Sequence, residues 1–308
     1  MAVFTDINQL PQFKNTVLTV GTFDGVHQGH ITILNQVVAK AAEVGGESVL
    51  VTFDPHPRKF LFPHQPLGLI TPLESKIELV TETGIDHVVV VPFNTDFSRL
   101  TAKGYIEKFL VANFHPKVII LGYDHRFGHD RLGDIHMLRH YQPTYQYELV
   151  EIPAQLIDAA AVSSTRIRNA IKDGRIEEAN TMLGRNYSIK GSVVKGRQLG
   201  RTIGFPTANL TPADESQKLP GNGVYVIACT YNDMIYMGMA NIGYAPTVTE
   251  KKEIKIEANL FDFDFDIYGE HIEIAFLKKI RNEEKFQSLD HLKARLALDK
   301  EEALSYFA

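Results

Sequence analysis

The first half of the chain alternates short apolar runs with longer amphipathic segments. The apolar runs predict buried strands, and they lie at 16–20, 48–53, 87–91 and 117–121. Between these strands, apolar residues recur at the three- and four-residue spacing of a helix, over 30–44, 73–83 and 102–113. Continuous apolar strands that alternate with helices are typical of a parallel sheet covered on both faces. We therefore predict an α/β fold for this half.

The pattern changes near Gly184. From residue 187 onward, apolar and polar residues alternate with period two, which predicts antiparallel strands. The candidate strands are 187–194, 223–231, 235–240, 255–263 and 272–276. A closing helix over 289–307, capped by Ser288, is also predicted. We therefore expect an α/β domain at residues 1–183 and a small antiparallel β-barrel or sandwich, with a C-terminal helix, at 184–308.

Composition narrows the classes of function. The chain of 308 residues has a net charge of -5, so it offers no overall basic field for nucleic acid or an anionic membrane. Cys229 is its single cysteine, which excludes an intramolecular disulfide and a Cys-rich zinc site. The N-terminus lacks the regions of a signal peptide, and no apolar run reaches about 18 residues, which argues against a transporter. We expect a cytoplasmic protein that acts on small molecules.

One polar motif, GTFDGVHQGH at 21–30, joins the first predicted strand to the following helix. Gly21 and Gly25 permit tight turns or a close approach of the backbone to a ligand. His27 and His30 reach the start of the helix, where free N–H groups and the helix dipole favour an anion. Imidazoles there can donate hydrogen bonds to phosphate oxygens during nucleotidyl transfer. Two alternatives stay open: ordinary structural histidines, and a zinc site that would need a further ligand from elsewhere in the chain.

Two further polar segments follow predicted strands: DPHP at 54–57 and GYDHRFG at 122–128. Ligands of parallel α/β sheets bind at the carboxyl ends of the strands, so we expect these segments at the same edge as the 21–30 motif. A predicted helix over 163–173 begins with SSTRIR, whose hydroxyls, helix-start N–H groups and arginines suit anionic oxygens. Taken alone, this last segment also fits a capped helix on the protein surface.

The second half carries a different motif, GRTIGFPTAN at 200–209. A preceding string at 191–198 is nearly a Walker A sequence, but it lacks the Lys-Ser/Thr pair, so a P-loop kinase is not predicted. Read by itself, the 200–209 segment also fits a glycine-rich hairpin loop. Glu257 lies in an alternating strand whose neighbouring apolar residues face the other way. Its side chain could therefore point into the mouth of the barrel, or simply to solvent.

The 21–30 motif resembles the HxGH sequence of the nucleotidylyltransferase superfamily, and its full form is similar to the bacterial FAD synthetase group. The segments at 52–57, 122–128 and 163–168 resemble three more motifs of that group. The resemblance implies a Rossmann-like domain that adenylylates FMN with ATP, with His27 and His30 as catalytic residues. The residues implied to bind ATP are Gly21, Phe23, Asp24, Gly25, His27, His30, Ser163, Ser164, Thr165 and Arg166. The residues implied to bind the flavin are Asp54, Pro55, His56, Asp124, Arg126 and Phe127.

The 200–209 segment resembles the riboflavin kinase sequence GRxxGFPTAN, and this resemblance extends to the C-terminal helix. It implies phosphorylation of riboflavin by ATP, with Glu257 as the catalytic base. Thr207 and Asn209 are implied to hold Mg²⁺, since hydroxyl and amide oxygens are hard ligands. The resemblance also implies that ATP lies at Gly196, Gly200, Arg201 and Gly204, and that Arg281 and Glu283 lie near the flavin.

The chain departs from the two family patterns at a few positions. Asp54 stands where the FAD synthetase group often has Glu, and His125 stands where it usually has Phe. Tyr244 and Ala245 replace the commoner residues before a Pro-Thr pair. These departures leave the reaction types intact, and they bear on how the flavin is packed.

Together, the two resemblances predict one bifunctional enzyme. It would make FMN from riboflavin and then FAD from FMN, with ATP as the substrate of both steps, Mg²⁺ as cofactor and release of pyrophosphate in the second step. Three alternatives stay open: a chain with only one working module, an adenylyltransferase for another small phosphate, and a flavin-binding regulator or carrier. No nucleic-acid or membrane partner is expected.

Overall fold

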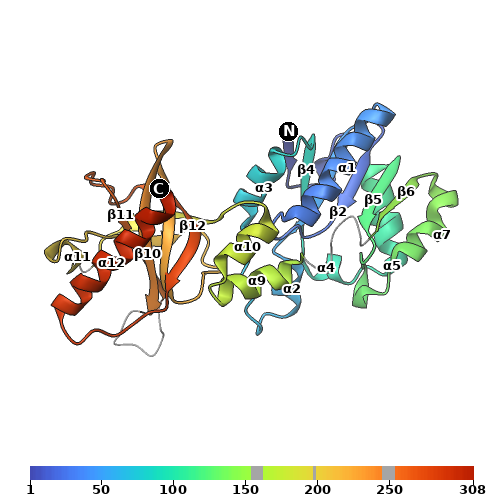
Figure 1. The fold of residues 1–308 in the computed structure, drawn as a ribbon. Coiled ribbons are helices and arrows are strands. Elements are labelled where there is room, and N and C mark those ends of the chain that lie inside the picture. The colour runs from blue at the N-terminus through green and yellow to red at the C-terminus, as the bar shows by residue number, and fades with distance from the viewer. Residues whose placement is uncertain (154–161, 197–198, 245–253) are drawn as a thin grey trace. The chain divides into compact units, whose positions relative to one another are not determined.

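The computed structural model describes residues 1–153, 162–196, 199–244 and 254–308. The chain divides into two compact units, Met1–Ser164 and Thr165–Ala308 (Figure 1). Nearly all of helix α9 (Ser164–Lys172) and all of α10 (Ile176–Leu183) therefore fall in the second unit, where α10 packs against barrel strands. The functional boundary that the sequence predicts near residue 184 is not tested by this division and stays a prediction.

The first unit is built on a six-stranded sheet in the order β1-β4-β3-β2-β5-β6, and all its pairings are parallel. The apolar runs correctly predict the four inner strands, β2, β3, β4 and β5, but they do not predict β1 or β6. Both are edge strands, which need no continuous apolar sequence. The strands are β1 (Ala2–Phe4), β2 (Val17–Val20), β3 (Ser48–Asp54), β4 (His87–Pro92), β5 (Val118–Gly122) and β6 (Glu148–Ile152).

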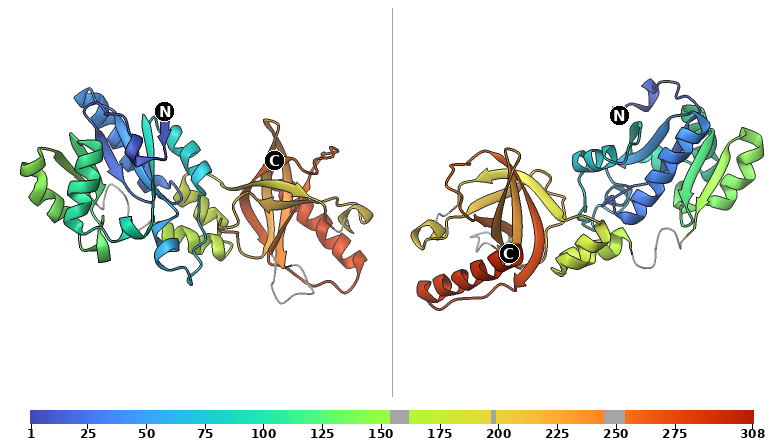
Figure 2. Two further views of the ribbon diagram at one scale, coloured as in Figure 1. Left: turned by 180° about the vertical axis from the view of Figure 1, so that it is seen from behind. Right: turned by 45° about the horizontal axis from the view of Figure 1, so that its top comes forward.

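Helices cover both faces of this sheet (Figure 1 and Figure 2). On one face, Leu34 of α1 (Gln28–Val44) and Val80 of α3 (Leu73–Thr81) belong to a core cluster that includes Val88. The next residue along β4, Val89, belongs to the cluster on the other face. Successive strand residues thus enter different cores, which explains why these strands are apolar throughout.

The helix predicted over 102–113 is composed of three parts. A short α5 (Ala102–Gly104) leads into a π-helix, η2 (Tyr105–Val111), and ends in α6 (Ala112–Phe114). The other helical segments of this unit are η1 (Ile7–Gln9), α2 (Pro57–Leu61), α4 (Thr95–Ser98), η3 (His129–Arg131) and α7 (Ile135–Tyr145).

The second unit is a closed antiparallel barrel in the order β10-β11-β8-β7-β12-β9. This finding decides between the barrel and the sandwich that the alternating pattern left open. Helix α12 (Leu289–Phe307) lies against the outside of the barrel, where Ala303 packs with Val224 and Met239 (Figure 1). The strands are β7 (Tyr187–Val194), β8 (Ala208–Pro212), β9 (Gly223–Tyr231), β10 (Met234–Tyr244), β11 (Ile254–Leu260) and β12 (His271–Arg281), and a short helix α11 (Leu199–Thr202) precedes β8.

A buried ion pair joins α12 to the barrel wall. Asp299 is fully buried on α12, and both of its carboxylate oxygens accept hydrogen bonds from the Arg281 guanidinium at 2.7 to 3.0 Å. The Arg281 side chain is itself only 10% exposed, and it lies 5.6 Å from the ring of Phe286. The pair therefore ties the last helix to the end of β12.

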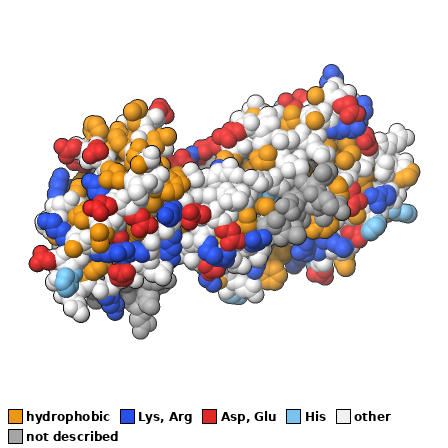
Figure 3. All heavy atoms as spheres, in the orientation of Figure 1, with side chains coloured by type: hydrophobic (Ala, Val, Ile, Leu, Met, Phe, Trp, Pro, Cys, Tyr) orange, Lys and Arg blue, Asp and Glu red, His pale blue; other side chains and the backbone are white. Residues whose placement is uncertain are grey.

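None of the helices in the described ranges is long and apolar enough to cross a membrane. On the face shown in Figure 3, basic and acidic side chains are interspersed over each unit.

We expect Asp299→Ala to destabilise the barrel by about 3 kcal/mol, because it leaves the Arg281 guanidinium buried without its counter-charge. Urea unfolding of the full chain, followed by far-UV circular dichroism, measures the change. Glu302→Ala is the matched control on the same helix, since Glu302 pairs only loosely with Lys278 at 3.7 Å in an exposed position. The control should change stability by less than about 0.5 kcal/mol, and equal effects of the two variants would contradict the prediction.

Candidate functional site

The strand order of the first unit defines where a ligand should bind. From β2 the chain proceeds through β3 and β4 on one side of the sheet, and it then returns to add β5 on the other side of β2. The order thus reverses between β2 and β5. In doubly wound sheets, ligands bind outside the carboxyl ends of the strands at this point. The loop after β2 and the loop after β5 both begin there, as the sequence predicts.

The loop after β2 is tightly turned. The N–H of Gly21 still donates to the carbonyl of Val51 on β3, at 3.0 Å, before the backbone leaves the sheet. Phe23, Gly25 and Val26 then adopt φ angles of 46°, 96° and 37°, in the left-handed region. Such angles cost free energy for Phe and Val, so the surrounding contacts must hold this loop in place.

His27 and His30 meet at the start of α1. His27 is the N-cap residue, and its Nδ1 accepts a hydrogen bond from the backbone N–H of His30 at 3.3 Å. The neutral His27 ring therefore carries its proton on Nε2. The two imidazole rings stack, with centroids 3.6 Å apart and planes 14° apart, and His30 also contacts the Phe23 ring at 4.8 Å. The sequence prediction that both histidines reach the helix start is confirmed.

The buried side chain of Asp24 holds the loop after β2 in place through hydrogen bonds. Its side chain is 1% exposed, and its Oδ1 accepts hydrogen bonds from the backbone N–H groups of Ile70 and Thr71, at 2.9 and 3.1 Å. The hydroxyl of Ser164 donates to the Asp24 carbonyl at 2.8 Å. The structure thus brings the start of the SSTRIR segment to the HxGH loop, although 140 residues separate Ser164 from Asp24.

Other residues predicted to bind ATP lie in different surroundings. Ser163 directly precedes Ser164 and is exposed. Thr165 and Arg166 belong to the second unit, where the Arg166 guanidinium donates to the Glu178 carboxylate at 3.1 to 3.2 Å. A role of Arg166 with phosphate remains a prediction.

The residues predicted to bind flavin sit at the ends of β3 and β5. Asp54 ends β3 and is exposed, as is Pro55, and His56 caps α2 by accepting a hydrogen bond from the N–H of Arg58 at 3.1 Å. Beyond β5, Asp124 is exposed. Both segments are therefore at the carboxyl edge of the sheet.

The loop after β5 is organised by aromatic stacking and one ion pair. Phe127 is buried and stacks on Tyr105 with centroids 4.8 Å apart, and the His125 ring lies over Phe127 at 5.9 Å. Arg126 donates to Asp134, the N-cap residue of α7, at 3.0 Å. The loop is thus fixed from both sides, and Arg126 already has a carboxylate partner.

In the barrel, the strand register gathers the residues predicted for the kinase. Glu257 on β11 lies directly opposite Asn209 of β8 on one side and Asn241 of β10 on the other. Directly opposed residues of antiparallel strands share a face of the sheet, with Cβ atoms about 4.5 to 5.5 Å apart. The neighbours Ile256 and Ala258 are buried on the opposite face, as the alternation predicts.

The row formed by Asn241, Glu257 and Asn209 lies on the outer side of the barrel wall. Asn241 is paired in turn with Val224 of β9, which packs beneath α12 on the outside of the barrel. The sequence left two orientations of Glu257 open, into the barrel mouth or to solvent. In the structure its side chain lies on the outer face of the barrel wall and does not point into the barrel.

Two glycines bring the backbone close to the predicted magnesium ligands. A Cβ atom on Gly196 would lie 2.3 Å from the Nδ2 of Asn209, and one on Gly200 would lie 3.5 Å from the hydroxyl of Thr207. Gly204 has a φ of 86°, and Arg201 is exposed. Across the described residues, no three His, Cys, Asp or Glu side chains form a metal-binding group. Thr207 and Asn209 offer oxygen donors instead, which suit a hard cation that arrives with ATP phosphates.

Sequence reasoning missed two neighbours of this site. Asn241 extends the row described above, and Asn259 is buried and donates from Nδ2 to the carbonyl of Pro206 at 2.6 Å, which holds the FPTAN loop. Asn259 lies two residues after Glu257 in the same strand, so period-two alternation could have placed both on one face.

Arg281 and Glu283, which are predicted to lie near the flavin in the barrel, both contact other parts of the protein. The Glu283 carboxylate closely approaches Gly243, leaving no room there for a Cβ atom, and it accepts from Asn222 at 3.4 Å. Arg281 is engaged by Asp299, as described above. The departure at Ala245 lies outside the described residues.

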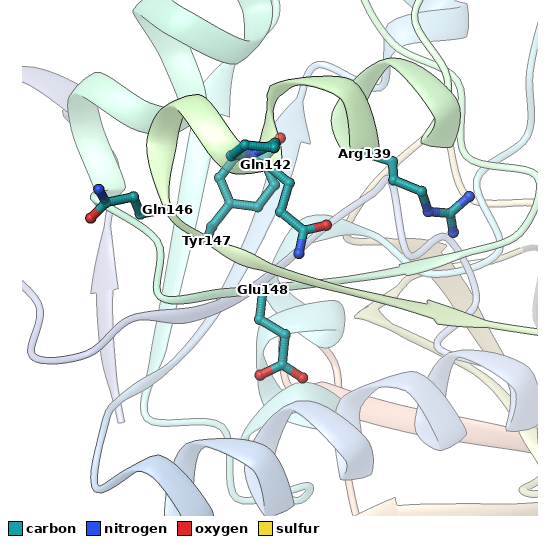
Figure 4. Close-up of a pocket in the computed structure, with 6 residues that line it drawn as sticks. Arg139, Gln142, Gln146, Tyr147 and Glu148 are labelled. Atoms are coloured by element: carbon teal, nitrogen blue, oxygen red, sulfur yellow. The ribbon is translucent and has the colours of Figure 1, made fainter.

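An open depression elsewhere in the first unit is not the candidate site. It is lined by the end of α7 and the start of β6, including Arg139, Gln142, Tyr147 and Glu148 (Figure 4). The start of β6 is the amino edge of the sheet, opposite the loops that carry the predicted chemistry.

Comparison with known proteins identifies a family for each half of the chain. The FAD synthetase family model matches residues 9–166, and the riboflavin kinase model matches residues 183–307. A bifunctional riboflavin kinase/FMN adenylyltransferase from Listeria monocytogenes is 37% identical over 99% of this chain and 94% of its own length. The enzyme of the same description from Escherichia coli K12 is 36% identical over 98% of this chain and 96% of its own. The chain belongs to this bifunctional family.

The sequence-based prediction of two modules is therefore confirmed. This chain has both an FAD synthetase domain and a riboflavin kinase domain. ATP and the flavins are accordingly its substrates and products.

A solved structure bears a different description. A macrolide-efflux protein from Streptococcus pneumoniae superposes with a TM-score of 0.86 and 31% identity, over 97% of both chains. The two proteins therefore share the folds of both units. In the described part of our chain, no helix could span a membrane. The family models that match the chain are those of two enzymes.

His125 generates a prediction about pH. Burial, with a smaller contribution from Arg131, lowers the pKa of His125 from the ordinary 6.5 to about 4. Between these two values the unfolded chain binds a proton at this site and the folded chain does not, so stability from this group is complete above pH 6.5 and is lost as pH falls toward 4. We expect His125→Phe to lose less stability than the wild type across that window. Calorimetric midpoints at several pH values test this, and parallel curves would contradict it.

Proposed function

We propose that the chain phosphorylates riboflavin to FMN in its barrel and adenylylates FMN to FAD in its α/β unit, with one ATP consumed in each step. The match of two family models to separate halves of the chain carries this proposal. The grouping of the predicted residues at the carboxyl edge of the sheet and on one face of the barrel supports it. A cytoplasmic location and the lack of a nucleic-acid partner remain proposals from the single cysteine and the net charge of -5.

In the kinase step, Glu257 accepts the proton of the ribityl 5′-hydroxyl as that oxygen attacks the γ-phosphorus of ATP, and ADP leaves. Thr207 and Asn209 would hold Mg²⁺, which neutralises phosphate charge when it is bound. The register of Glu257 with Asn209 supports these roles, because it sets the proposed base beside a proposed magnesium ligand. Gly196 lets the loop backbone pack directly against the Asn209 amide, where a Cβ atom would not fit.

In the adenylyltransferase step, a phosphate oxygen of FMN attacks the α-phosphorus of a second ATP, and pyrophosphate leaves. His27 donates from Nε2 and, together with His30 and the N–H groups at the start of α1, stabilises the charge that develops on the phosphorus oxygens. No covalent intermediate with the protein is needed, because positioning and charge stabilisation suffice for this transfer. The stacked arrangement of the two histidines at the helix start supports this role.

The purified full chain should be incubated with riboflavin, ATP and Mg²⁺, and FMN, FAD, ADP and pyrophosphate should be separated over time. We expect FMN first and then FAD with pyrophosphate, and removal of Mg²⁺ by a chelator should stop FMN formation. FMN alone would contradict the adenylyltransferase proposal, and FAD formed only from added FMN would contradict the kinase proposal. Flavin binding without turnover would favour a regulator or carrier.

Two variants should separate the steps. Glu257→Gln removes the base while keeping the shape of the side chain, so FMN formation should fall by roughly 10²- to 10⁴-fold while FAD formation from added FMN is unchanged. His30→Ala should do the reverse, with FAD formation reduced by roughly 10²-fold and FMN accumulating. Each variant is the control for the other. Unchanged FMN formation by Glu257→Gln, or unchanged FAD formation by His30→Ala, would remove that residue from its site.

A further inference from the structure

A buried lysine lies beneath the adenylyltransferase loop. Lys76 is on α3, where Leu73, Ile77 and Val80 form the apolar face that packs against the sheet. Its side chain falls within that apolar face and is only 6% exposed. Lysine is among the residues least often buried, because removing an ammonium group from water costs several kcal/mol unless partners compensate. The partners of Lys76 therefore indicate why it is there.

The first partner connects Lys76 to the backbone of the loop. Its Nζ donates to the hydroxyl of Thr52 at 3.4 Å, and this hydroxyl donates to the carbonyl of Thr22 at 3.2 Å. Thr52 is fully buried on β3, so its position is set by the sheet. The ammonium group is thus linked through one side chain to the residue that precedes the left-handed Phe23.

The other partners are charged. The carboxylates of Asp24 and Asp54 interact electrostatically with the Lys76 ammonium and favour its charged form, whereas burial acts against it and leaves the pKa of Lys76 below its ordinary value. Asp24 is the buried residue that anchors the loop to Ile70 and Thr71. The buried Asp24 carboxylate therefore offsets part of the cost of burying the ammonium group.

We infer that Lys76 is a positioning residue for FMN adenylylation: its buried ammonium group, linked through Thr52 to Thr22 and paired electrostatically with Asp24, fixes the loop that carries His27. The inference rests on the adenylyltransferase function proposed above. This role explains how the loop keeps left-handed φ angles at Phe23 and Val26. The residues on either side of Phe23, Thr22 and Asp24, both interact with the Lys76 and Thr52 group. Lys76 acts through the loop and does not itself touch the reacting phosphates.

A double-mutant cycle tests this role. Lys76→Met keeps the length of the side chain and removes its charge, so FAD formation from added FMN should fall by roughly 10- to 100-fold in kcat, as a displaced catalytic loop predicts. Asp24→Asn should also lower kcat. Because the two charges compensate each other, the double variant should lose no more than the worse of the two single variants. Fold-losses that multiply in the double variant would overturn the inference.

Two controls and one replacement variant keep the result specific. FMN formation by the barrel of the same variant should be unchanged, which shows that the second unit is intact, and a far-UV circular dichroism spectrum and a urea midpoint close to the wild type should show that the first unit is folded. Lys117→Met removes an exposed lysine at the amino end of β5 and should leave FAD formation at the wild-type rate. If Lys76→Met does not fold, Thr52→Val replaces it, since it cuts the link to Thr22 at constant shape. It should lower kcat several-fold, and a wild-type rate would overturn the inference.

The two proposals fail differently. A wild-type chain that makes no FAD from FMN and ATP contradicts the proposed function itself. An active wild type with an equally active, folded Lys76→Met contradicts only the role of Lys76.

Discussion

The common direction of parallel strands is the constraint on which the first unit depends. Because β2, β3 and β5 all run the same way, the segments that follow them emerge at one edge of the sheet. Residues far apart in sequence therefore meet there, and Ser164 reaches the carbonyl of Asp24. Helix α1 begins at the same edge, so its N-terminus adds an electrostatic preference for anions to a geometry that the sheet has already imposed.

The barrel also brings residues that are far apart in sequence together, but it does so through the pairing of antiparallel strands. Antiparallel register decides which side chains share a face, and here it aligns amides from two strands on either side of the Glu257 carboxylate. The loops contribute the Thr207 hydroxyl and also backbone, through Gly196, which packs against the Asn209 amide. The two chemistries of the chain therefore use different architectural rules, one based on strand direction and the other on strand pairing.

The strands could be predicted from the sequence wherever a local pattern of apolar residues encodes them. Continuous apolar runs identified the inner strands of the sheet, and period-two alternation identified the barrel strands, whereas edge strands such as β6 lack either pattern. Pairing register is a tertiary property, so the position of Asn241 beside Glu257 could not be predicted from spacing. The same holds for Lys76 and Asp299, since a charge at a buried position is recognised only when its partner is seen. Motif residues were found by resemblance, and that route assigned Arg281 to the flavin without revealing its buried partner.

Closure of the barrel has a consequence for how the chain behaves at high concentration. Every strand in the ring order β10-β11-β8-β7-β12-β9 has a neighbour on both sides, so this sheet presents no free row of N–H and C=O groups to a strand from another molecule. The open sheet of the first unit does have two such rows. They are confined to β1, which is only three residues long, and to β6, which carries Glu148 and Glu151. Short length and charged side chains both oppose intermolecular strand addition, so aggregation through sheet edges is disfavoured in each half of the chain by a different means.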